Sequence, residues 1–98
     1  MAFNQQETSP VFIHGIKTVG ITPEAVSTDG RKLYKGIVLK AATSNTGSIH
    51  VGFTAAAADT VAAFPLYAGD SLTLAINAVD KVYVVASNDT QSVYFIGS

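Results

Sequence analysis

The sequence predicts an all-β domain built as a two-sheet antiparallel β-sandwich with about seven strands. Short segments rich in β-branched and aromatic residues recur along the 98-residue chain, and Gly, Asn and Asp separate them at close intervals. No segment sustains the 3.6-residue period of an amphipathic helix. A chain of this length supports one hydrophobic core, so we expect a single domain over residues 11–98 that follows a flexible N-terminal arm over residues 1–10.

The N-terminal half of the domain contains four predicted strands. They cover residues 11–19, 21–26, 33–42 and 48–53. The Asp29-Gly30 pair, between the second and third strands, is a strong hairpin signal because both residues tolerate the positive φ of a tight turn. A polar turn over residues 43–47 separates the third strand from the fourth, and we expect these two strands to pair as a second hairpin.

The C-terminal half contains three more predicted strands, over residues 71–77, 81–87 and 91–96. Alternation places these side chains in the core: Leu72, Leu74, Ile76, Val82, Val84 and Ala86. The alanine-rich segment 54–63 is too short for a stable helix and precedes Pro65, so we expect a crossing loop with at most one helical turn. Short strands at this spacing are typical of jelly-roll-like or immunoglobulin-like sandwiches.

Composition excludes several classes of function. The chain has no Cys, which excludes thiolate metal sites, iron–sulfur clusters and redox pairs. Six basic and seven acidic residues give a net charge of -1, so the chain lacks the positive charge that neutralises nucleic-acid phosphates. No apolar run approaches the roughly 20 residues of a membrane-spanning helix, and the first residues lack the pattern of a secretory signal. We therefore expect no nucleic-acid partner, no membrane partner and no signal peptide.

No residue pattern predicts an active site. The two histidines, His14 and His50, lie outside any recognised catalytic motif. The carboxylates are scattered singly, and four of them fall where turns are expected, which favours local hydrogen bonding to the backbone: Asp29, Asp70, Asp80 and Asp89. We therefore predict a non-enzymatic protein with no catalytic residue, no metal site and no cofactor.

The last two predicted strands break the alternation of apolar and polar side chains. A sandwich strand with one solvated face carries polar residues at every second position, yet here both faces are apolar or aromatic. We therefore expect four side chains to need a cover: Tyr83, Val85, Tyr94 and Ile96. The cover is either the chain itself, through the N-terminal arm or the alanine-rich loop, or a neighbouring subunit, because tyrosine is favoured at interfaces. These four residues form the candidate interface.

Several motifs follow one another between Tyr34 and Ile96, over about two thirds of the chain. They are Tyr34-Lys35-Gly36-Ile37-Val38-Leu39-Lys40-Ala41, Asn45-Thr46-Gly47, Ile49-His50-Val51-Gly52, Phe64-Pro65-Leu66 with Ala68-Gly69-Asp70-Ser71-Leu72, and Val82-Tyr83-Val84-Val85-Ala86. This order of strand, Asn-Gly turn, strand, Pro-containing turn and strand resembles a recurrent pattern of small virion structural proteins of tailed bacteriophages.

The resemblance implies a viral structural protein that decorates or cements a phage capsid. Such a protein is a homo-oligomer that binds the major capsid protein, is made in the host cytoplasm and becomes part of the virion, with residues 2–10 gripping neighbouring shell subunits. The alternative is a phage tail or fibre module that binds a host receptor or a glycan, with Tyr67, Tyr83 and Tyr94 stacking against sugar rings. A soluble binding module or an intersubunit adaptor from outside viruses is a third possibility.

Overall fold

The computed structural model describes residues 12–56, 58–59 and 63–98. Within these ranges the chain forms eight strands and one short 3-10 helix. The elements are β1 (Ile13–Val19), β2 (Glu24–Ala25), β3 (Ile37–Ala41), β4 (Ile49–Gly52), β5 (Phe64–Leu66), β6 (Ser71–Leu74), the helix η2 (Val79–Lys81), β7 (Tyr83–Ala86) and β8 (Gln91–Gly97). The predicted arm over residues 1–10 lies outside the described residues.

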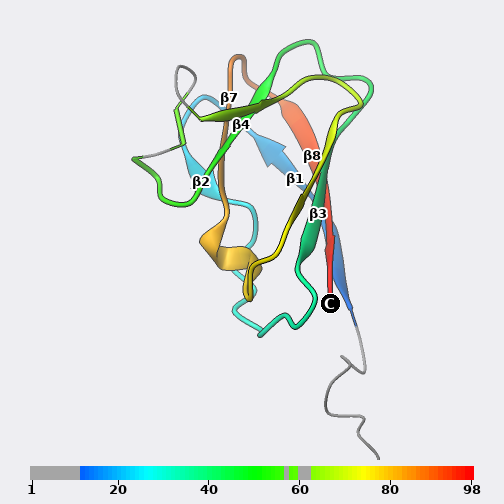
Figure 1. Cartoon of the computed structure of the whole chain (residues 1–98). Helices are drawn as coiled ribbons and strands as arrows, with labels where there is room; N and C mark the ends of the chain where they lie inside the picture. Colours follow the sequence, from blue (N-terminus) through cyan, green and yellow to red (C-terminus); the bar gives the residue numbers. More distant parts are fainter. Residues whose placement is uncertain (1–11, 57, 60–62) are drawn as a thin grey trace, which may run out of the picture.

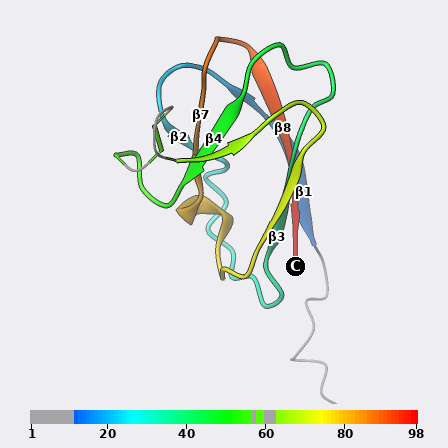
Figure 2. The ribbon, with the colours of Figure 1, turned by 45° about the horizontal axis from the view of Figure 1, so that its top comes forward.

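The strands form two four-stranded antiparallel sheets that pack face to face (Figures 1 and 2). Sheet A has the order β1-β8-β3-β6, and sheet B has the order β2-β7-β4-β5. The prediction of an all-β, two-sheet antiparallel sandwich is confirmed. The core between the sheets is made of aliphatic side chains from both, and the largest fully buried ones are Ile37, Leu39, Ile49, Leu66, Val19, Val26, Val79, Val84 and Val93.

The pairing order identifies the type of sandwich. The pairing is nested, because β1 pairs with β8, β2 with β7, β3 with β6 and β4 with β5. Successive pairs alternate between sheet A and sheet B. Eight strands paired in this nested way form a jelly roll. The immunoglobulin-like alternative is wrong, because it places the first two strands in one sheet, whereas β1 and β2 lie in different sheets.

Both predicted hairpins are wrong. β2 lies in sheet B, β3 in sheet A and β4 in sheet B, so neither the Asp29-Gly30 pair nor the turn over residues 43–47 joins two strands of one sheet. The physical reason is that the alternation of apolar and polar residues shows which face of a strand is buried but not which strand it pairs with. A strand with one apolar face can occupy either sheet, and the turn residues that favour hairpins serve equally well in connections that cross between sheets.

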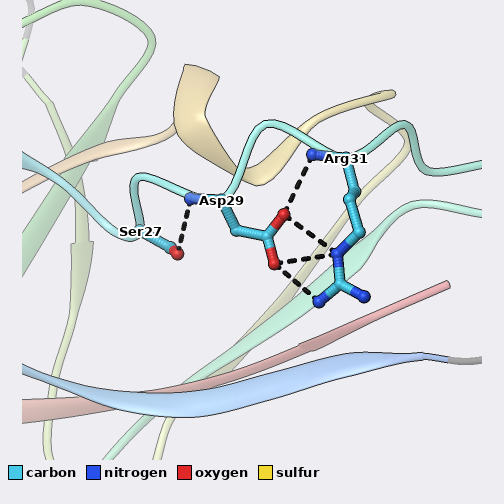
Figure 3. A network of polar contacts seen from close by, with 3 residues as sticks. All are labelled: Ser27, Asp29 and Arg31. Carbon is cyan, nitrogen blue, oxygen red and sulfur yellow. Dashed lines mark hydrogen bonds and ion pairs between the residues drawn. The ribbon is translucent and has the colours of Figure 1, made fainter.

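The Asp29-Gly30 region is ordered by side-chain hydrogen bonds instead (Figure 3). The Asp29 carboxylate accepts the backbone N–H of Arg31 at 3.0 Å and the Arg31 Nη2 at 2.7 Å, while the Asp29 N–H donates to Ser27 Oγ at 3.1 Å. The Arg31 side chain is the main cause that lowers the pKa of the Asp29 carboxyl, and the bond in turn raises the pKa of Arg31. Local bonding by Asp, predicted from the sequence, is found here and at Asp70, whose Oδ2 accepts the N–H of Tyr67 at 2.9 Å.

The polar turn over residues 43–47 is bound to the start of β8 rather than closing a hairpin. The Asn45 side chain accepts the N–H of Ser92 at 2.8 Å and donates to the carbonyl of the same residue at 2.9 Å. The buried Gln91 accepts the N–H groups of Thr46 and Gly47 through Oε1, at 2.8 and 2.9 Å. These long-range bonds fix the connection between the sheets and the register of β8 beside β3.

The strand absent from the prediction is β5. Pro65 lies at its centre, and a proline normally argues against a strand because it cannot donate to the ladder. β5 is an edge strand that pairs only with β4, so the missing N–H costs no sheet bond on its outer side. The sequence alone does not show that β5 is an edge strand, so this eighth strand could not be predicted from it.

Candidate functional site

The outer face of sheet A carries the largest group of exposed apolar side chains that share one register. Because Ile37, Leu39 and Val93 point into the core, the alternate residues of β3 and β8 point outward. The pairing places Ile96 between His14 and Val38, and it places Tyr94 between Ile16 and Lys40. Two cross-strand rows on this face therefore combine apolar residues from three neighbouring strands.

We call the outward apolar residues of this face the outer patch. Its members are Phe12, Ile16, Val38, Tyr94 and Ile96, with exposed fractions of 57%, 55%, 38%, 50% and 45%. The Phe12 ring also lies beside the His14 ring, with the centroids 5.6 Å apart. Side chains of this kind at the centre of a sheet face are typical of protein interfaces.

The charge and size of this face define what it can bind. Among the described outward residues of the four strands, Lys40 is the only one with a formal charge, and Thr73, Ser71, Thr18 and Ser92 surround the patch with hydroxyl groups. At ~3.3 Å per residue and ~4.8 Å between strands, the face covers on the order of 400 Å². A standard interface buries about 800 Å² on each partner, so this face supports a small contact between proteins.

The predicted residues of β7 lie in sheet B, on the side away from the outer patch. Val85 points away from the core and is nevertheless only 3% exposed, and its register neighbour His50 is 8% exposed. Ala58, in the connection from β4 to β5, is fully buried, and Figures 1 and 2 show the start of that connection on the side of sheet B away from sheet A. Tyr83 is half-buried and lines a hollow together with Phe53 of the same connection. The chain itself therefore covers this face.

The four candidate residues thus divide into two pairs. Tyr94 and Ile96 lie together at the centre of the exposed face of sheet A, whereas Tyr83 and Val85 lie on sheet B. Sequence reasoning omitted Ile16, Val38 and Phe12 from the candidate interface. The run Ile37-Val38-Leu39 has the same broken alternation as β8 and signals Val38, but Ile16 carries no such signal because the polar Lys17 takes the inward position beside it.

His50 is the one buried histidine of the described residues. Its Nε2 lies 2.8 Å from Ser48 Oγ, and its Nδ1 is buried without a hydrogen-bond partner. Because Nδ1 has no hydrogen-bond partner, the ring is not oriented there by a carboxylate as the histidine of a nucleophilic triad is. Within the described ranges, no three His, Asp or Glu side chains gather as metal ligands.

Comparisons with protein-family models, with curated proteins and with solved structures found no match to this chain. Among the described residues, no helix combines the length and the apolar character of a membrane span.

Proposed function

We propose that the chain is a non-enzymatic structural protein that decorates or cements a phage capsid. In this proposal, copies of the chain associate through the outer patch of sheet A, and the resulting oligomer binds the major capsid protein. The resemblance to small virion proteins supports the viral assignment. The observation that carries the proposed mode of action is the exposure of Tyr94 and Ile96 at the centre of an apolar sheet face.

Burial of the outer patch is the driving force for the proposed association. Phe12, Ile16, Tyr94 and Ile96 keep about half of their surface in water in the single chain, and a second copy would remove that surface. The face is small, so self-association in solution should depend on concentration. On a symmetric particle many such contacts act together, and this multivalency can raise the apparent affinity about 100-fold or more.

Sedimentation velocity over a concentration series tests the self-association. We expect the wild-type chain to form oligomers as its concentration rises, and Ile96→Asp to remain a single chain because a carboxylate would be desolvated in the contact. Ile21→Asp is the matched control, because Ile21 is 61% exposed and lies outside the outer patch. A wild-type chain that stays monomeric at every concentration, or a loss of oligomers in both variants alike, would contradict the proposal.

The viral role has its own test. Particles of the phage that encodes the chain are purified by density gradient, and their proteins are quantified by mass spectrometry. We expect the chain at a fixed ratio to the major capsid protein, and we expect Ile96→Asp to lower that ratio. Absence of the wild-type chain from intact particles would refute the structural role.

The alternative of a glycan-binding tail or fibre module has less support from the geometry. The three tyrosines considered for stacking lie in three places: Tyr67 in the turn before β6, Tyr83 on sheet B and Tyr94 on sheet A. A sugar site needs several such groups around one hollow. These tyrosines therefore do not build a shared site.

A further inference from the structure

The four edge strands of the sandwich differ in how they are protected against pairing with another chain. β1 carries the inward-pointing Lys17, which forms an ion pair with Glu24 of β2. β2 has only two residues, and β5 has three with Pro65 at the centre. A charge directed inward, a very short edge and a proline are all devices that discourage the addition of a further strand.

The fourth edge strand, β6, has neither an inward charge nor a proline, and its one such device is a bulge just before its first residue. It contains Ser71, Leu72, Thr73 and Leu74, without a charge or a proline. Among the described strands β6 pairs with β3 alone, so its other side presents backbone groups that no described strand pairs with.

The ladder shows which backbone groups of β6 are unpaired. Gly69, with φ of 85°, and Asp70 form a bulge opposite Ala41, because Gly69 N–H donates to the Ala41 carbonyl and Ala41 N–H donates to the Asp70 carbonyl. From this point hydrogen-bonded pairs recur at every second residue, so Leu72 and Leu74 bond to β3. The N–H and C=O groups of Ser71 and Thr73 therefore point to the free edge.

An apolar groove lies beside this edge, on the side of the sandwich where β5 and β6 are the outermost strands. Its volume is about 350 Å³, and its lining is almost entirely apolar: Val51, Gly52, Phe53, Phe64, Leu72, Leu74, Ile76, Lys81 and Val82. Leu72, Leu74 and Ile76 pack on the core but remain only partly buried. A strand added to β6 would direct alternate side chains into this groove.

Positive charge marks one end of the groove. Lys81 and Ile76 line both this groove and an adjoining hollow of about 440 Å³, which also contains Lys35 and Asn77. Within the described residues neither Lys35 nor Lys81 belongs to an ion pair, since the two ion pairs found there involve Lys17 and Arg31. A carboxylate at this end of a bound segment would therefore lie near Lys81, with Lys35 in the adjoining hollow.

We propose that the free edge of β6 and the adjoining groove bind an extended segment of a partner protein. The segment adds to sheet A as a fifth strand, places apolar side chains at alternate positions in the groove and ends near Lys81 with an acidic residue. This inference deepens the proposed function and rests on it for the partner, which is the shell protein to which the oligomer binds. The outer patch remains the contact between copies.

A synthetic peptide tests the backbone pairing. The probe is an end-blocked peptide of alternating Thr and Val that carries one Glu, prepared with the Glu at either end. Titration into ¹⁵N-labelled protein should shift the resonances of β5, β6 and Lys81 and slow the amide exchange of Thr73 about 10-fold or more for one of the two peptides. Shifts confined to the outer patch, or unchanged exchange at Thr73 with both peptides, would overturn the proposal.

Two substitutions at one position separate backbone pairing from side-chain contact. Thr73→Pro removes the outward N–H but no bond to β3, so the fold should persist, as checked by circular dichroism, while peptide binding weakens about 10-fold or more. Thr73→Val keeps the N–H and should bind like the wild type. Equal binding by the Pro variant would refute strand addition. If that variant does not fold, the amide exchange rate of Thr73 in the wild-type complex tests strand addition in its place.

The charge at the end of the groove has a reciprocal test. Lys81→Glu should weaken binding of the Glu-bearing peptide and strengthen binding of the same peptide with Lys in place of Glu. Parallel changes for both peptides would refute the charge contact. Particle analysis distinguishes failure of this inference from failure of the proposed function. If Thr73→Pro enters particles at the wild-type ratio, strand addition is refuted and the viral role is not. If the wild-type chain is absent from particles, the viral role is refuted and peptide binding is not.

Discussion

One strand of each sheet has the same sequence pattern, but the outer sides of these two strands differ in exposure. β7 and β8 both carry apolar residues on two faces, yet Val85 of sheet B is 3% exposed, whereas Tyr94 of sheet A is 50% exposed. The same broken alternation thus marks one face that the described residues cover and one face that they leave exposed. The pattern indicates that a face needs a cover, but it does not say what the cover is.

The topology explains the difference. Every connection between consecutive strands passes from one sheet to the other except that between β4 and β5, which both lie in sheet B. Among the described residues of that connection, Ala58 is fully buried, so this part of it packs against the protein. No connection between strands of sheet A exists in the described chain, so no loop between consecutive strands returns over its outer patch.

The largest expected effect comes from placing the same charge on each face. Val85→Asp should lower the free energy of unfolding by about 3 kcal/mol, because desolvation of a carboxylate there costs more than a contact with the neighbouring His50 returns. Ile96→Asp should lower it by only about 1 kcal/mol in the dilute, monomeric chain, because Ile96 is already 45% exposed and loses only part of its burial. Urea denaturation at low protein concentration measures both. Equal losses would mean that the two faces are buried alike.

The next effect concerns the register that aligns the outer patch. Gly36, which immediately precedes β3, has φ of 106°, and a Cβ there would overlap the carbonyl oxygen of Leu74 in β6. Gly36→Ala should therefore lower stability by about 2 kcal/mol through backbone strain and displacement of β3 from β6. Gly30→Ala is the control, since a Cβ there makes only an ordinary contact with Asp80. Thermal unfolding of both variants checks the difference. If Gly36→Ala were as stable as Gly30→Ala, the start of β3 would not be fixed against β6.

A smaller effect is expected on the covered face. His50 buries Nδ1 without a partner, which costs free energy that an apolar side chain would not. His50→Leu should leave stability unchanged or raise it by about 1 kcal/mol, as measured by urea denaturation at neutral pH. Ser48→Ala is the companion variant, because it removes the bond to Nε2 while the ring stays in place. A clear loss of stability in His50→Leu would indicate that the ring makes a favourable polar contact.

The smallest effect is pH-dependent and lies outside both faces. The bond from Arg31 lowers the pKa of Asp29 in the folded chain, so folding favours the charged carboxylate. The stabilisation is therefore present at neutral pH and is lost as the pH falls through the lowered pKa. Because the pair is exposed, the contribution is small. The wild type and Asp29→Asn should differ in stability at pH 7 and converge in strong acid, and an equal difference at both pH values would exclude the charge as its cause.

Much of the fold could be predicted from local patterns in the sequence. Alternation correctly placed Leu72, Val82 and Val84 toward the core, because the period of a strand depends only on its own residues. The pairing order could not be predicted, since an apolar face suits either sheet. β5 was missed because Pro65 is acceptable only at an edge, and an edge is defined by the whole sheet.

The candidate surface was predictable in part for a similar reason. Tyr94 and Ile96 stand out because β8 has apolar residues on both faces. Ile16 does not stand out, because Lys17 occupies the inward side of β1 and is neutralised by Glu24 from the other sheet. A local pattern cannot identify a charge partner that folding brings from a different strand. Contacts between sheets therefore decide which residues complete the outer patch.

Hydroxyl-radical footprinting of the tyrosines tests most directly whether the open face of sheet A is the contact between copies. Tyr94 and Tyr67 have similar exposure in the single chain, at 50% and 60%, but only Tyr94 belongs to the outer patch. We expect Tyr94 to become protected several-fold as the concentration rises into the oligomeric range, while the reactivity of Tyr67 stays constant. Constant reactivity of Tyr94 in a chain that oligomerises, with protection at Tyr67 instead, would contradict the account.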